Sequence, residues 1–383
     1  MRKRLFHITG CVLAALSCFL FFARGTAADA AAVGTDAAEE ADGLYESTGA
    51  ADLFARLDDE TRALLEAVGA DLADPGSAAR VSPAGVLNGV AALFSDGLGD
   101  EVKQLSLLLS MLLLFAAVSC FLPRAEEDGT LSLIVFLCFA AVEIPTATAL
   151  VGGVLSSLEA VSAFVRLLVP LMGVLVSASG APAASAALTA TAVGAAEAVS
   201  LAVDSLFVPL TGAYGAVCVI GAADGFFSAD RGMRLVKKVF SVLVGGAALV
   251  FTGVLSLRGA ASKAADSLAL RGAKFLVGGL VPVVGGAMSE GLSAVTASLN
   301  AVNDSVGALG IAAIAMILLP PIVRVLTHRA VLWCASLAGE LAGIPRAGAY
   351  FSGISEALSM LDILLLLDGF VFICALGLLI GAG

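Results

Sequence analysis

The sequence predicts an all-α, polytopic helical membrane protein with about seven to eight spans and a small helical segment outside the membrane. Of its 383 residues, 59% are hydrophobic and 14% are charged, whereas a soluble domain has about 45–50% apolar and about 25% charged residues. Several apolar stretches reach the roughly 20 residues that an α-helix needs to cross a bilayer. The alternation over ~10-residue segments that is typical of a membrane β-barrel is absent.

Residues 1–27 have the pattern of a secretory signal peptide. Three basic residues, Arg2 to Arg4, precede an apolar run from Leu5 to Ala23. Small residues around Ala27 then provide candidate cleavage sites. Because the apolar run is long, an uncleaved membrane anchor is the alternative interpretation.

Residues 28–101 form an acidic segment that we expect to be extracytoplasmic. From Asp29 to Glu101 there are 16 acidic and three basic residues, a net charge of −13, in a chain whose total is −11. Apolar residues recur there at helical spacing, and Ser82 followed by Pro83 is typical of a helix start. We therefore expect two or three short helices at the membrane surface.

Residues 102–383 form the predicted multi-spanning domain. The expected spans are Leu105–Leu122, Leu131–Val151, Val161–Val176, Pro182–Val203, Leu206–Phe226, Val239–Leu257, Val306–Val323 and Ser359–Ile380. Basic residues between spans favour the cytoplasmic side. This rule places Arg231–Lys238 in the cytoplasm. It also places there the basic residues after Val323, provided that residues 258–305 add no net crossing; these residues are Arg324, His328, Arg329 and Arg346.

A short apolar run late in the chain predicts a re-entrant or broken helix. Phe275–Ala287 has only 13 residues and contains several helix-breaking residues. Irregular backbone at membrane depth is tolerated only against protein or a watery cavity. The predicted break is formed by Gly278, Gly279, Pro282, Gly285 and Gly286.

A polar stripe follows this break. Ser289, Ser293, Thr296, Asn300 and Asn303 share one helical face, with Glu290 beside them, and leucines and valines form the opposite face. One interpretation is that these six residues line a conduit or an interior polar surface. The alternative is an interfacial helix whose polar face lies in water.

Ionisable residues within or near the spans form a second candidate set. They are Glu143, Arg166, Glu197, Asp204 and Asp362. A charge at the centre of a span costs roughly 2.5–3.5 kcal/mol on insertion scales, so we expect these side chains to face the protein interior, water or a counter-charge. Arg166 could pair with Glu143 or Glu159. An ion or proton path and simple interhelical pairing both fit the pattern.

Motifs for enzymes, metals and cofactors are missing from the sequence. There is no P-loop, and two histidines in total exclude an HExxH zinc site. The seven cysteines lie in apolar runs without metal-binding spacing, and no basic stripe suggests nucleic acid. We therefore predict no catalytic residue, metal or cofactor. A membrane-embedded protease using Asp224 and Asp362 is a weaker alternative.

The order of these features resembles one known family. The run Lys274-Phe275-Leu276, then Pro282 to Ala287, then Ser289-Glu290 is similar to the stage III sporulation protein AE family of endospore-forming bacteria. The resemblance implies a multi-pass subunit of a channel or secretion-like complex, in the mother-cell membrane around the forespore. It also implies partners: other membrane subunits, a separate cytoplasmic secretion-type ATPase and ring-forming proteins.

The sequence therefore predicts a non-enzymatic subunit that lines or braces a membrane conduit, in contact with the lipid bilayer and not with nucleic acid. A stand-alone secondary transporter or permease for a small solute is the alternative function. A scaffold without a conduit also fits the same residues.

Overall fold

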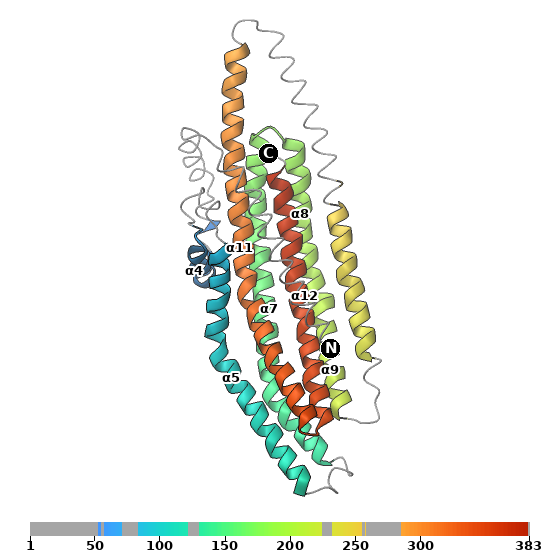
Figure 1. The fold of residues 1–383 in the computed structure, drawn as a ribbon. Helices are drawn as coiled ribbons and strands as arrows, with labels where there is room; N and C mark the ends of the chain where they lie inside the picture. Colours follow the sequence, from blue (N-terminus) through green and yellow to red (C-terminus); the bar gives the residue numbers. More distant parts are fainter. Residues whose placement is uncertain are drawn as a thin grey trace.

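The computed structural model is a bundle of long α-helices, and the part of the chain that it describes contains no β-strand (Figure 1). The described residues are 53–54, 57–70, 83–121, 130–223, 232–254, 257 and 285–381. The prediction of an all-α polytopic architecture is confirmed. The predicted signal peptide, and the glycine- and proline-rich residues before 285, lie outside the described residues.

The helices run mostly antiparallel to one another along one bundle axis (Figure 1). In chain order they are α4 (Asp59–Val68), α5 (Pro83–Phe121), α7 (Thr130–Ala178), α8 (Pro182–Ala202), the π-helix η2 (Val203–Phe207), α9 (Val208–Ala223), the helix Gly232–Val254, α11 (Gly285–Leu341) and α12 (Pro345–Ile380). Six of the described helices are long and apolar enough to cross a membrane.

Local sequence explains where the first described helices begin and end. The Asp58 carboxylate accepts a hydrogen bond from the backbone amide of Thr61 at 3.1 Å and caps the start of α4. Gly69 ends that helix with a φ of 94°, a left-handed conformation that glycine adopts without a steric penalty. As the sequence predicts, a helix begins at Pro83, where the missing amide hydrogen costs no helical hydrogen bond. The expectation of a short surface helix there is corrected, since α5 continues without a break into the predicted span Leu105–Leu122.

Two pairs of predicted spans are continuous in the structure. Leu131–Val151 and Val161–Val176 both belong to α7, since the residues between them contain no proline and the helix continues through Gly152 and Gly153. The spans Pro182–Val203 and Leu206–Phe226 are joined by η2, where the helix widens without ending. Because each pair forms one helix, the structure has six candidate spans among the described residues, where the sequence predicted seven to eight.

The helix α11 lies at the centre of the bundle. It packs against α5, α7 and α12, and most of its apolar stretch is buried. Its contact with α12 is close, because an added Cβ on Gly339 would lie 3.0 Å from the backbone nitrogen of Gly348. Gly343, with a φ of 77°, closes the turn between the two helices.

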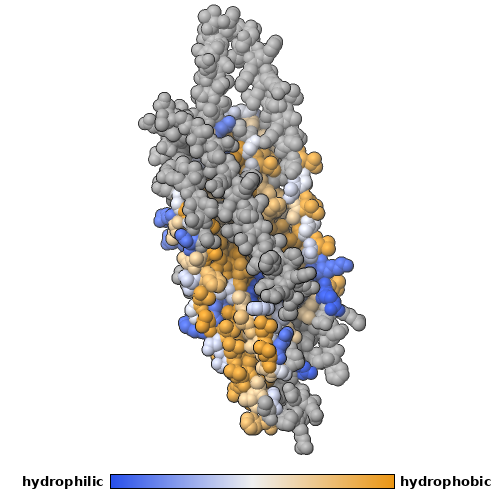
Figure 2. All heavy atoms as spheres, in the orientation of Figure 1, coloured by the Kyte–Doolittle hydropathy of each residue, from blue (hydrophilic) through white to orange (hydrophobic). Residues whose placement is uncertain are grey.

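The outer surface of the bundle is strongly apolar. Figure 2 shows orange side chains along the described part of the visible face, with hydrophilic patches at its sides. The exposed apolar residues include Leu113 and Leu114 on α5, Val174 on α7 and Leu249 on the helix Gly232–Val254. Apolar side chains on the outside of a bundle are expected where lipid or other membrane proteins surround the helices.

Candidate functional site

The candidate site is a short segment of α11, Pro320 to Arg329, in which two prolines are followed by three basic residues. Proline has no amide hydrogen, so Pro320 and Pro321 cannot donate to the carbonyls one turn earlier. The carbonyl oxygen of Ile317 loses both donors, at positions i+3 and i+4, that a helix could offer it. A backbone acceptor is thereby freed in the middle of the central helix.

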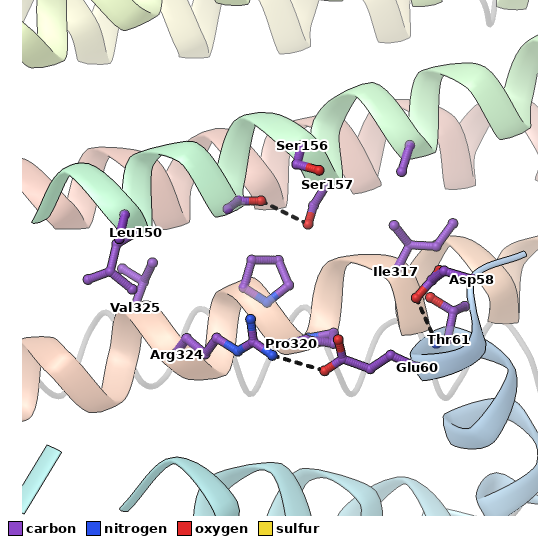
Figure 3. Close-up of a pocket in the computed structure, with 14 residues that line it drawn as sticks. Asp58, Glu60, Thr61, Leu150, Ser156, Ser157, Ile317, Pro320, Arg324 and Val325 are labelled. Carbon is purple, nitrogen blue, oxygen red and sulfur yellow. Dashed lines mark hydrogen bonds and ion pairs between the residues drawn. The ribbon is translucent and has the colours of Figure 1, made fainter. Parts of the chain in front are cut away.

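A cavity of about 370 Å³ lies beside the two prolines (Figure 3). Its walls come from α7, α11 and the start of α4, and Ile317, Ser156 and Ser157 are among the lining residues. The Arg324 guanidinium and the Glu60 carboxylate also line it and lie 3.1 Å apart. Hydroxyls and charged groups thus line this cavity, next to the residue whose carbonyl the prolines leave without helical donors.

His328 lies between two carboxylates. Its Nε2 is 2.5 Å from an oxygen of Glu143 on α7, and its Nδ1 is 3.0 Å from an oxygen of Glu101 on α5. The His328 and Glu143 side chains are fully buried, whereas that of Glu101 is partly exposed. The Gln104 amide also donates to Glu143, at 3.3 Å. This imidazole therefore connects α5, α7 and α11.

Arg329 completes the segment. Its Nη1 lies 2.5 Å from a carboxylate oxygen of Asp362 on α12, and its Nε donates to the Ser355 carbonyl at 3.2 Å. Both charged side chains are buried. Because an isolated charge is costly in an apolar bundle, the two groups stabilise each other's position.

The three basic residues thus meet acidic residues from α4, α5, α7 and α12. The buried pairs His328–Glu143 and Arg329–Asp362 can fix α7 and α12 against α11, since removing one charge would leave its partner buried and unpaired. The exposed Arg324–Glu60 pair adds little to this effect. No group of three metal-ligating side chains converges anywhere in the described ranges. Nor does any cysteine, serine or threonine appear among the polar contacts of His328 in that part of the chain.

Two of the sequence-predicted ionisable residues contact this segment: Glu143 of α7 and Asp362 of α12. Arg166 and Glu197 lie elsewhere and pair with each other at 3.0 Å, between α7 and α8, with both side chains about half exposed. The expected partners of Arg166 were Glu143 and Glu159, so that pairing expectation is corrected. It failed because Glu143 and Glu159 lie 23 and 7 residues before Arg166 on the same continuous helix α7, and neither has the three- or four-residue spacing of a pair within one helix.

The predicted polar stripe lies at the start of α11. The backbone from Gly285 onward is helical, so Gly285 and Gly286 begin a helix there, while Gly278, Gly279 and Pro282 lie outside the described residues. The side chains of Asp204 and of Ser289, Glu290, Ser293 and Thr296 also lie outside the description.

Two stripe residues have described side chains. Asn300 is half-buried. Asn303 is fully buried, and its amide faces the carbonyls of Leu379 and Ile380 at 3.4 and 3.5 Å. Asn303 therefore contacts the carboxyl-terminal end of α12.

Sequence reasoning missed the basic residues of the segment. Arg324, His328 and Arg329 were expected after the end of a span, on the cytoplasmic side, but they lie inside α11 and two of them are buried. Two signals could have located them. The apolar run resumes directly after Arg329, and the buried acids Glu143 and Asp362 needed a counter-charge.

Comparisons with known proteins agree on one family. A family model described as Stage III sporulation protein AE matches residues 78–383. A curated protein of Bacillus subtilis (strain 168), named Stage III sporulation protein AE, is 22% identical over 242 residues. The match covers 62% of this chain and 61% of that protein, so the chain spans less than two thirds of its relative. No solved structure matches the chain.

Proposed function

The chain belongs to the stage III sporulation protein AE family, and from this membership we propose that it is a non-enzymatic membrane subunit of a sporulation channel or secretion-like complex. In this proposal the complex connects the mother cell with the forespore. The subunit sits in the mother-cell membrane with residues 28–101 outside the cytoplasm, and it lines or braces the conduit. A separate cytoplasmic ATPase and ring-forming proteins are its expected partners.

The observation that carries the proposal is the length of α7, which has exposed apolar residues near both of its ends. Ile134 and Val174 are large, exposed apolar residues of α7 and lie 40 residues apart on a continuous helix. At 1.5 Å per residue, they are separated by about 60 Å. The hydrocarbon core of one bilayer is only about 30 Å thick. One bilayer therefore cannot cover the apolar residues at both ends of this helix, and other protein subunits would cover those that lie outside it.

The central helix supports the bracing role within this proposal. The segment Pro320–Arg329 is held by acids from four other helices, as expected of a rigid support. Beyond the tips of α7, α8 and α12, the first turns of α11 extend from the bundle (Figure 1). The polar stripe of the sequence begins in this extension, where a neighbouring subunit could contact it.

A tagged pull-down from sporulating cells in mild detergent, analysed by mass spectrometry, tests the proposal. We expect a secretion-type ATPase and ring-forming membrane proteins to be recovered with the chain. Recovery of the chain alone, under conditions that recover a known membrane complex from the same cells, would contradict it. ATP hydrolysis by the purified chain would contradict the non-enzymatic part.

The cavity beside Pro320 and Pro321 favours a second candidate function, a secondary transporter for a small solute. Transporter substrate sites are often formed where a membrane helix is interrupted and frees backbone carbonyls. Ile317, whose carbonyl lacks its helical donors, and the Arg324–Glu60 pair are among the residues that line the cavity at such a position. Solute uptake by the chain alone in liposomes, abolished by filling this cavity with Gly153→Leu, would support the transporter.

A further inference from the structure

A second cavity lies on the other side of α12, away from the segment Pro320–Arg329. It has a volume of about 340 Å³, is lined by α8, η2, the helix Gly232–Val254 and α12, and opens to the outside of the bundle. Its walls are alanine, valine, leucine and phenylalanine, with Thr191 and Asp368 as the polar lining residues. The volume lies in the range of about 300–1,000 Å³ that is typical of small-molecule sites.

Asp368 is the unusual member of this wall. The residue is 1% exposed, and neither carboxyl oxygen has a hydrogen-bond partner among the residues that the structure describes. The other buried acids, Glu143 and Asp362, each have a basic partner. Burying an unpaired carboxylate in apolar surroundings is strongly unfavourable. A cation in the adjoining cavity would remove this cost.

The small number of oxygen ligands and the apolar and aromatic lining of the cavity indicate which kind of cation it could bind. A hard metal ion needs about six or more oxygen ligands, and the cavity offers one carboxyl group. The Thr191 hydroxyl already donates to the Ala187 carbonyl at 2.6 Å. A primary ammonium would bring three N–H donors to a wall with few acceptors. An alkylated ammonium needs one counter-charge and apolar or aromatic contacts, such as Phe207 and Phe251 could provide.

We propose that this cavity binds a small organic cation with an alkylated ammonium group and an apolar body, and that Asp368 is its counter-ion. The site is separate from the Pro320–Arg329 segment and does not depend on the proposed role in a complex. Binding to the purified chain can therefore fail while the pull-down succeeds, and the reverse.

Equilibrium binding of radiolabelled benzyltrimethylammonium to the purified full chain, in phosphatidylglycerol nanodiscs, tests this site. We expect saturable binding that Asp368→Asn weakens about tenfold or more and that Asp368→Glu largely retains. Phe251→Leu should weaken it about threefold through the lost aromatic contact. Ala195→Leu, which fills the cavity, should abolish it. The matched control Glu159→Gln removes an exposed carboxylate outside the cavity and should leave affinity unchanged.

Three competitors separate the alternatives. Neopentylbenzene has the same shape without the charge and should not displace the probe, and neither should millimolar Na⁺. Displacement by phosphatidylcholine added to the nanodiscs would identify a lipid headgroup as the source of the ammonium, whereas its failure would indicate a free solute. Absence of saturable binding, equal binding by Asp368→Asn, or displacement by Na⁺ or by the neutral compound would overturn the proposal.

Discussion

Neutralising Asp362 should strongly destabilise the chain by leaving Arg329 buried without a counter-charge. The two groups lie 2.5 Å apart, and their side chains are 2% and 10% exposed. Unit charges about 4 Å apart attract by about 4 kcal/mol at an effective dielectric of 20. This value agrees with the about 3–5 kcal/mol lost when one partner of a buried pair is removed. We expect Asp362→Leu to lower the free energy of unfolding by that amount.

The loss of stability should come from the unpaired buried charge and not from the absence of either side chain by itself. In the double variant Arg329→Met/Asp362→Leu no charge remains buried, so most of the loss should be recovered. Unfolding of the purified chain in mixed micelles, followed by far-UV circular dichroism, measures all the variants. The matched control is Asp100→Asn, which breaks the exposed Asp100–Lys103 pair and should leave stability unchanged. A double variant as unstable as the sum of its single variants would refute the reasoning.

Three further variants test other contacts by the same unfolding measurement. His328→Leu leaves Glu143 without its basic partner and should cost about 3–5 kcal/mol, part of which Glu143→Gln should restore; no loss would mean that the imidazole is not a counter-ion. Gly339→Ala should cost about 1–3 kcal/mol because its Cβ would meet the Gly348 backbone, whereas Gly152→Ala meets no atom within 4 Å and should not destabilise. Asn303→Ala removes a donor from the last carbonyls of α12 and should cost about 1 kcal/mol; an unchanged unfolding curve would exclude that role.

Composition and apolar run length were sufficient to predict the fold class. A chain with 59% hydrophobic residues and repeated apolar runs has few alternatives to a membrane helix bundle. The start of α5 at Pro83 also followed from local chemistry. The continuity of α7 did not follow from the sequence, since two separate spans were predicted there, Leu131–Val151 and Val161–Val176. The helix continues through Gly152 and Gly153 between them.

The candidate site was only half predictable. Glu143 and Asp362 attracted notice because an acid in an apolar run needs a partner. Their partners could not be assigned, since pairing between α7, α11 and α12 depends on how the helices pack and not on spacing within one helix. The predicted end of the span at Val323 also failed, since α11 continues to Leu341 and buries His328 and Arg329 within it.

Site-specific photocrosslinking in sporulating cells tests most directly whether the chain acts as a subunit of a complex. A photoreactive amino acid is placed at Ser293, in the first turns of α11, and at Val306, which is fully buried and serves as the control. The account predicts that Ser293 crosslinks to another membrane protein, identified by mass spectrometry, and that Val306 crosslinks only within the chain. If Ser293 yields only lipid adducts or no adduct, while the tagged chain is present at normal levels, the chain does not contact a partner subunit there and the account is contradicted.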